Sequence, residues 1–168
     1  MIDLAKSDWV IGKILPTQAK RFKDKVYVQT RESKVTYEEM ETITNRFANA
    51  FLGLGLKKGD KACLMLENCL EHLYCWFGLG KIGVVDVPIN MAYKGQILEY
   101  VINNSEARVL VVDRNYLDRI RFLEKELKKI QKVVIFDPPN CESSGNELKT
   151  ETLNLKEFFS FPDTAPDV

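Results

Sequence analysis

Residues 61–113 read KACLMLENCLEHLYCWFGLGKIGVVDVPINMAYKGQILEYVINNSEARVLVVD, and this stretch decides the fold class. Three short apolar runs, at 61–68, 84–90 and 107–113, predict buried strands. The segments between them, at 70–83 and 94–105, carry apolar residues at helical spacing. Strands that alternate with amphipathic helices favour an α/β fold, with a parallel sheet flanked by helices on both faces and right-handed crossovers.

The same alternation continues toward the C-terminus. Residues 115–130 predict a helix, because Leu117, Ile120, Leu123, Leu127 and Ile130 fall on one helical face. Residues 132–137 predict a fourth strand, which completes a β-α-β-α-β-α-β core. Beyond it, residues 138–152 are polar and rich in turn-forming residues, so we expect a surface loop. Residues 153–161 predict a short amphipathic helix.

Toward the N-terminus, Thr36 and Glu39 form the T-x-x-E pattern of a capping box and predict a helix that ends near Gly53 and Gly55. Asn68 and Glu71 suggest a second cap, at the start of the helix over 70–83. Residues 26–31 and the return from residue 34 predict a β-hairpin around the turn RESK.

A short, irregular helix interrupted by Pro16 is expected before the hairpin. We therefore divide the single domain 1–168 into three parts: a peripheral helix and hairpin (1–35), the α/β core (36–137), and a loop with a short helix (138–168).

Composition narrows the classes of function. The chain of 168 residues carries 24 basic and 24 acidic side chains, and this balance argues against a broad nucleic-acid or anionic-membrane surface. Lys81 and Asp86 interrupt the most apolar stretch, so no transmembrane segment is predicted. The N-terminus lacks a signal-peptide pattern, and the four cysteines are expected to be free thiols. The expectation is a cytoplasmic protein, with a peripheral location at a membrane as the alternative.

Two glycine-rich motifs invite a cofactor interpretation. GLGKIG at 78–83 matches G-x-G-x-x-G, but it lies late in a predicted helix and leads into a strand, the reverse of the dinucleotide-binding order. Close helix packing by Gly78 and Gly80, with a C-cap at Gly83, is the alternative. GLGLKKGDK at 53–61 lacks the G-K-[ST] ending of a phosphate loop, so a solvated turn is favoured over phosphate binding.

Candidate reactive side chains are few. Cys69, His72 and Cys75 are three residues apart on a predicted helix, but a fourth zinc ligand and a group to orient a nucleophile are not evident. Buried structural cysteines are the alternative. Tyr93 and Lys94 follow the carboxyl end of a predicted strand, where open α/β sheets bind ligands.

Charged side chains are expected to pair on the surface rather than to form an acid–base site. Glu124 with Lys128, and Glu126 with Lys129, have the spacing of helical surface pairs. The sequence therefore predicts no assembled catalytic, cofactor-binding or metal site.

Residues 20–168 resemble the N-terminal region of AMP-forming acyl-CoA synthetases, in the superfamily of adenylate-forming ligases. Matching features recur in order and with the expected spacing: Thr36-Tyr37-Glu38-Glu39, Asn45-Arg46, Ala48-Asn49, Gly55, Lys58-Gly59-Asp60, Glu67-Asn68, Trp76-Phe77-Gly78-Leu79, Gly83 and Val87-Pro88-Ile89-Asn90. The spacing from Asn68 to Leu79 is most similar to that of fatty-acyl or carnitine-type CoA ligases.

The resemblance implies a reaction in which a carboxylate attacks ATP to give an acyl-adenylate, and CoA then displaces AMP. A fatty acid is the expected substrate. ATP, Mg²⁺ and CoA would be the cofactors of the parent enzyme. The family's loop T-S-G-T-T-G-x-P-K normally follows a segment like PDTAPDV, so the chain is expected to be an N-terminal segment that is inactive alone. A basic residue after the VPIN-like strand holds the CoA nucleotide in some relatives, and Ala92 occupies that position here.

Two other hypotheses remain open. A standalone α/β interaction module without catalysis predicts a monomer that unfolds cooperatively, whereas a segment of a larger enzyme predicts self-association through exposed apolar edges. A small flavodoxin-like nucleotide-binding domain would bind flavin or nucleotide, and no such binding is expected.

Overall fold

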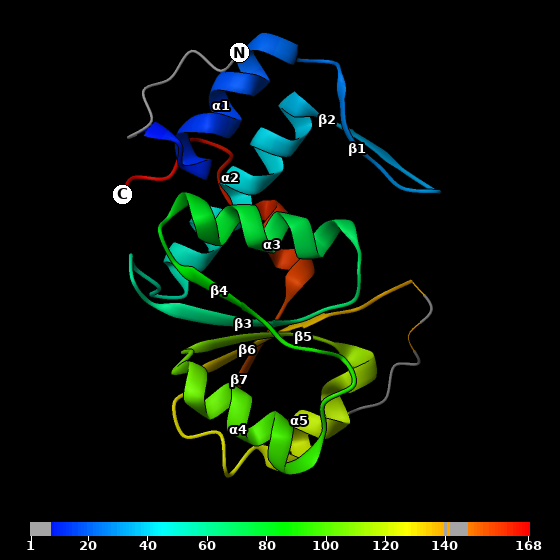
Figure 1. Ribbon diagram of the computed structural model, residues 1–168, viewed down its shortest axis with the longest axis vertical. Coiled ribbons are helices and arrows are strands. Elements are labelled where there is room, and N and C mark those ends of the chain that lie inside the picture. The colour runs from blue at the N-terminus through cyan, green and yellow to red at the C-terminus, as the bar shows by residue number, and fades with distance from the viewer. Residues whose placement is uncertain (1–7, 140, 142–147) are drawn as a thin grey trace.

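A five-stranded parallel sheet forms the centre of the computed structural model, which describes residues 8–139, 141 and 148–168 (Figure 1). Every ladder in this sheet is parallel. The strand order is β4-β3-β5-β6-β7. The strands are β3 (Lys61–Met65), β4 (Val85–Pro88), β5 (Val109–Asp113), β6 (Lys132–Phe136) and β7 (Glu151–Asn154). Because the chain runs from β3 out to β4 and then back across β3 to β5, the carboxyl ends of β3 and β5 form a topological switch point.

Helices cover both faces of the sheet, as the sequence predicted (Figure 1). α2 (Tyr37–Gly53) and α3 (Leu70–Lys81) pack on one face, with α1 (Ile11–Phe22) outside them. α4 (Gly95–Ser105) and α5 (Leu117–Leu123) cover the other. Adjacent strand residues point to opposite faces, so Leu64 packs with Phe47 and Phe51 while Met65 packs with Leu98 and Ile102.

The expected hairpin and capping box are confirmed. β1 (Val26–Gln29) and β2 (Lys34–Thr36) pair antiparallel. The Glu39 amide donates to Thr36 Oγ1 at 3.2 Å, and the Thr36 amide donates to Glu39 Oε2 at 2.8 Å. This reciprocal pair satisfies two backbone donors at the start of α2. α1 is a regular helix of 12 residues with Pro16 inside it, so the expected irregularity is wrong.

The helix predicted over 115–130 is also wrong in extent. A 3-10 turn, η2 (Arg114–Tyr116), comes first, and α5 ends at Leu123. Asn103 of α4 explains the early end, because its side chain donates to the Glu126 carbonyl at 2.9 Å and accepts from the Lys128 amide at 3.2 Å. These contacts occupy backbone groups that a longer α5 would have used internally.

The sequence missed strand β7, which lies in the predicted surface loop and short helix. It pairs parallel with β6, and the helix expected over 153–161 is a 3-10 segment, η3 (Leu155–Ser160). As an edge strand, β7 has only one neighbour and carries little of the apolar patterning that marks a central strand. Residues 140 and 142–147 of the predicted loop lie outside the described residues. The strands predicted at 61–68, 84–90, 107–113 and 132–137 are each shorter in the structure.

Candidate functional site

A cleft of about 670 Å³ lies where the carboxyl ends of β3, β5 and β6 meet, next to the switch point of the sheet. The turn of the β1–β2 hairpin and the 3-10 segment η3 form the rest of its wall. Its charged lining is mostly acidic: Glu32, Glu67, Glu71, Asp113 and Asp137, with Arg31 and Lys156. Ligands of open α/β sheets bind in this location, so the cleft is the best candidate site in the part of the chain that the structure describes.

Two of the acidic side chains are already engaged by neighbours. Asp113 is 2% exposed, and its Oδ1 accepts from the Asn115 amide at 2.8 Å, which caps η2. Burial raises the pKa of the Asp113 carboxyl, against the effect of that hydrogen bond. Asp137 accepts from Arg114 Nε and, at 2.6 Å, from Asn154 Nδ2. Although burial acts to raise it, these contacts lower the pKa of Asp137.

A third acidic residue belongs to a chain of contacts that joins three loops. The Tyr116 hydroxyl donates to Glu67 Oε1 at 2.5 Å, and this hydrogen bond raises the pKa of Tyr116. The Arg119 guanidinium stacks 4.7 Å from the Tyr116 ring centre and donates to the carbonyls of Met91 and, at 3.1 Å, Tyr93. The loops that follow β3, β4 and β5 are therefore fixed relative to one another.

Tyr93 and Lys94 do not line this cleft. Tyr93 is half-buried and packs against the core on the α4 and α5 side, while Lys94 is exposed and occupies the N-cap position of α4. Ala92 is exposed in the same loop. Tyr93 and Lys94 thus lie in the loop after β4, at the carboxyl edge of the sheet, as predicted. The cleft itself is formed by the loops that follow β3, β5 and β6.

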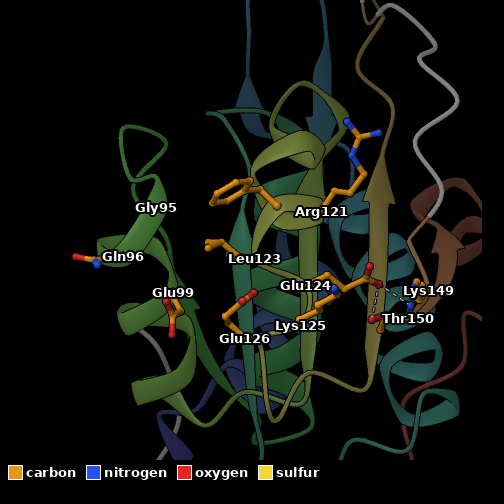
Figure 2. A pocket seen from close by; sticks show the side chains of 11 residues that line it. Gly95, Gln96, Glu99, Arg121, Leu123, Glu124, Lys125, Glu126, Lys149 and Thr150 are labelled. Atoms are coloured by element: carbon orange, nitrogen blue, oxygen red, sulfur yellow. Dashed lines mark hydrogen bonds between the residues drawn. The ribbon is translucent and has the colours of Figure 1, made fainter.

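A larger groove of about 930 Å³ lies along α4 and α5 (Figure 2). Figure 2 shows Gln96 and Glu99 on one side and Lys149 and Thr150 on the other. Glu124 in this groove accepts from the Thr150 amide at 2.7 Å and from its hydroxyl at 3.0 Å. The groove runs along helix flanks rather than strand ends, so it is the weaker candidate.

The predicted helical ion pairs are not formed, because α5 ends at Leu123. Glu124 binds Thr150 instead, and Lys129 pairs with Glu106 at 2.5 Å.

Both glycine motifs have the structural roles that the sequence favoured. A Cβ at Gly78 would lie 2.9 Å from Phe47 Cβ, and one at Gly80 would lie 2.8 Å from Ile11 Cδ1. Gly83 has a positive φ of 68° after α3. The 53–61 motif is a turn before β3, at the sheet edge opposite the cleft, and its Asp60 carboxylate accepts from Arg108 at 2.9 Å.

The cysteines and His72 form no metal cluster among residues 8–139, 141 and 148–168. Cys69 is the N-cap residue of α3 without a side-chain cap, so the expected Asn68–Glu71 cap is wrong. Burial raises the pKa of Cys63 to about 11 and that of Cys69 to about 12, and it also raises the pKa of the fully buried Cys75. These three thiols therefore stay protonated at neutral pH and are poor nucleophiles.

Sequence reasoning did not identify the cleft as a site, although Cys69, considered there as a metal ligand or nucleophile, is one of its lining residues. The signal was present for Asp113 and Asp137, since each ends a predicted strand and parallel strands end at one edge. No comparable signal marks residues 30–33, which the hairpin carries to the cleft from a distant part of the chain.

Comparisons with known proteins agree on one family. The model of a family described as "AMP-binding enzyme" matches residues 15–166. A crotonobetaine/carnitine–CoA ligase from Escherichia coli O1:K1 / APEC is 38% identical over 141 residues, which is 79% of this chain and 27% of that ligase. The chain therefore spans about a quarter of the length of this relative.

Solved structures share the fold. The anthranilate CoA ligase AuaEII in complex with anthranoyl-AMP matches with a TM-score of 0.81 and 23% identity, over 96% of this chain and 30% of the ligase. A fatty acyl CoA synthetase from Mycobacterium tuberculosis matches with a TM-score of 0.74 and 23% identity, over 94% and 29%. Within the described residues, no helix has the length and apolar character needed to cross a membrane.

Proposed function

This chain belongs to the AMP-binding enzyme family, and from that premise we propose that it is the N-terminal α/β unit of an ATP-dependent, AMP-forming acid–CoA ligase. The observation that carries the proposal is the 38% identity over 141 residues to a crotonobetaine/carnitine–CoA ligase. The proposed reaction joins a carboxylic acid to CoA through an acyl-adenylate and releases pyrophosphate and AMP. ATP, Mg²⁺ and CoA are the proposed cofactors, a fatty acid or a carnitine-like acid is the proposed substrate, and the cytoplasm is the proposed location.

The proposed role of this unit is to hold the loops that border the reaction site. Glu67, Tyr116 and Arg119 tie together the loops after β3, β4 and β5, and Arg114 with Asp137 and Asn154 ties β6 to β7. Such fixed loops can present groups to a substrate without reorganising when it binds. These contacts support the proposal that the unit is a scaffold at the edge of the reaction site and does not supply the reacting groups.

We further propose that the 168 residues alone do not form an acyl-adenylate. The cleft lining carries five carboxylates and two basic side chains, a balance that opposes a polyphosphate. Both carboxylate oxygens of Asp137 already accept hydrogen bonds, from Arg114 and from Asn154, and this disfavours Asp137 as a Mg²⁺ ligand. The phosphates and metal would then be held by residues outside this unit.

The test uses the full-length gene product that contains these residues and, separately, the 168-residue chain. The longer protein is expected to produce AMP and acyl-CoA in an acid-dependent manner with one acid from a panel of fatty acids, carnitine, crotonobetaine and benzoate. The isolated chain is expected to give no acid-dependent exchange of pyrophosphate into ATP. Production of ADP, or of AMP without acid, by the longer protein would refute the proposed reaction. Exchange of pyrophosphate into ATP by the isolated chain would refute the proposal that these 168 residues alone do not form an acyl-adenylate.

A further inference from the structure

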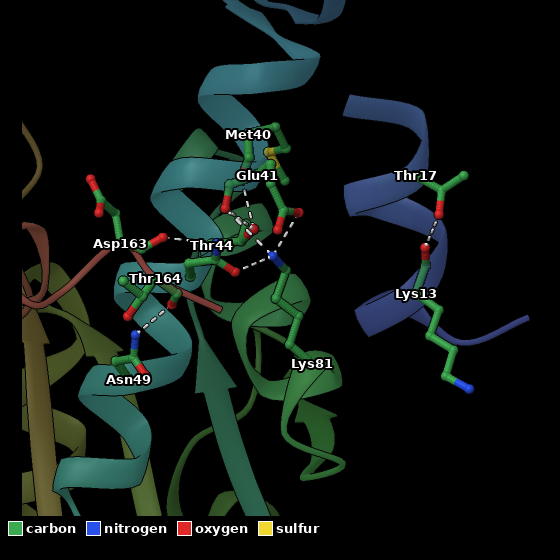
Figure 3. A network of polar contacts seen from close by, with 10 residues as sticks. Lys13, Thr17, Met40, Glu41, Thr44, Asn49, Lys81, Asp163 and Thr164 are labelled. Atoms are coloured by element: carbon green, nitrogen blue, oxygen red, sulfur yellow. Dashed lines mark hydrogen bonds and ion pairs between the residues drawn. The ribbon is translucent and has the colours of Figure 1, made fainter. Parts of the chain in front are cut away.

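Lys81, inside the GLGKIG motif, is a buried cation at the end of α3. Its side chain is only 2% exposed. The ammonium donates to Glu41 Oε2 at 2.7 Å and to Asn45 Oδ1 at 2.5 Å, both on α2 (Figure 3). Burial lowers the pKa of Lys81, while the hydrogen bond and charge of Glu41 oppose that shift. The lysine therefore joins two helices through a charged contact inside the apolar layer.

Stability alone is a poor reason for a lysine at this position. The cost of burying two charges often cancels their attraction, and well-packed apolar residues frequently serve as well. Glu41 keeps 17% of its side chain exposed and could turn toward water without Lys81. The more specific consequence of the ammonium lies with Asn45, whose side chain it contacts.

Lys81 determines which way the Asn45 amide faces. An ammonium can only donate, so it must face the amide oxygen of Asn45 and not the amide nitrogen. Asn45 is 6% exposed, and its Nδ2 then points away from Lys81 and donates to the carbonyl of Asp163 at 2.9 Å. The buried contact between Lys81 and Asn45 in this way determines the hydrogen bond that Asn45 makes to Asp163 on the surface.

Side chains of α2 make hydrogen bonds to each residue of the 162–164 segment. Asn49, one turn after Asn45, donates through Nδ2 to the carbonyl of Thr164 at 2.9 Å (Figure 3). The same nitrogen donates to the carbonyl of Pro162 at 2.8 Å. Two asparagines therefore engage three successive carbonyls of a segment that has no regular secondary structure. An exposed ion pair between Arg46 and the Asp163 carboxylate, at 3.1 Å, adds a weaker contact.

We propose that Lys81 is a positioning residue, which orients Asn45 so that α2 clamps the backbone of residues 162–164 and fixes the path of the chain leaving η3. The glycines of the same motif bring α3 close enough to α2 for this contact, since a Cβ at Gly78 would meet Phe47 at 2.9 Å. GLGKIG is thus a helix-packing motif with a buried polar connection. This inference does not depend on the proposed reaction.

The test measures backbone motion of residues 163 and 164 by ¹⁵N relaxation in the 168-residue chain, together with unfolding in urea. The key variant is Asn45→Asp. Its carboxylate still accepts from Lys81, but it meets the Asp163 carbonyl with an oxygen instead of a donor. We expect the order parameters at Asp163 and Thr164 to fall from about 0.85 to below about 0.6, with those of β3 and β5 unchanged.

Lys81→Met is the second variant, and it is expected to loosen the same two residues and to shift the side-chain amide resonances of Asn45. Lys125→Met, an exposed lysine after α5, is the matched control and should change neither measurement. Should Lys81→Met fail to fold, Asn45→Asp decides alone. Order parameters at 163 and 164 that stay near 0.85, or that fall equally throughout the protein, would overturn the proposal.

Discussion

Replacing Gly78 by Ala should destabilise the protein, although helix propensity predicts the opposite. Gly78 lies in α3, where Ala is favoured over Gly by about 1 kcal/mol in a helix interior. The added Cβ would, however, lie 2.9 Å from Phe47 Cβ, 3.1 Å from the Ala48 backbone nitrogen and 3.2 Å from the Phe47 carbonyl carbon. Two of these atoms are backbone, so relief requires α2 and α3 to move apart.

The magnitude follows from these opposing effects. Overpacking of a core costs roughly 1–3 kcal/mol, and a clash with backbone belongs at the upper end. Subtracting the propensity gain of about 1 kcal/mol leaves a net loss of about 2 kcal/mol. For a chain of this size, that loss lowers the melting temperature by about 4–8 °C.

Unfolding in urea, followed by circular dichroism and tryptophan fluorescence, measures the effect. Gly80→Ala is the matched control on the same helix, because its Cβ would meet Ile11 Cδ1, the flexible end of a side chain, at 2.8 Å. We expect that variant to be near neutral, since a rotamer change at Ile11 relieves the contact. A Gly78→Ala protein as stable as the wild type would refute the argument from close helix packing.

Three further predictions follow from individual contacts. Asp137→Asn should cost about 1–2 kcal/mol of stability at pH 7, because it weakens the bond to Arg114. The pKa of Asp137 is lowered in the folded state, so the stability that its carboxylate contributes is lost as the pH falls through that pKa. The stabilities of wild type and variant should therefore converge in acid, and a difference that is independent of pH would contradict this. Thr36→Ala should cost about 1 kcal/mol in urea unfolding through loss of the capping box, and an unchanged midpoint would exclude that role. A thiol reagent at neutral pH should modify the half-buried Cys141 before the other three cysteines; modification of Cys69 at an equal rate would count against its pKa of about 12.

The fold class was accessible from sequence because it depends on local periodicity. The apolar runs around Leu64, Val87 and Val111 differ from the helical spacing in α2 and α4, and this difference appears in any short window. The capping box at Thr36 was likewise predictable, because its partners are three residues apart. The family resemblance added the class of reaction, which the residues alone did not indicate.

The exact elements were less accessible, because distant side chains decide them. α5 ends at Leu123 since Asn103 takes backbone groups more than twenty residues away. β7 exists because the exposed edge of β6 offers unpaired backbone groups, which its own polar sequence does not reveal. Neither effect leaves a local pattern that a single sequence can show.

The sequence by itself determined a parallel α/β unit with capped, amphipathic helices, because burial on two faces imposes a pattern on neighbouring residues. Only the tertiary structure decided where chemistry could occur. It brought Asp113, Asp137 and the hairpin turn 30–33 to one cleft, and it buried Lys81 against Glu41. The physical reason is that such contacts join residues far apart in the chain, so their energies depend on packing geometry that no local spacing encodes.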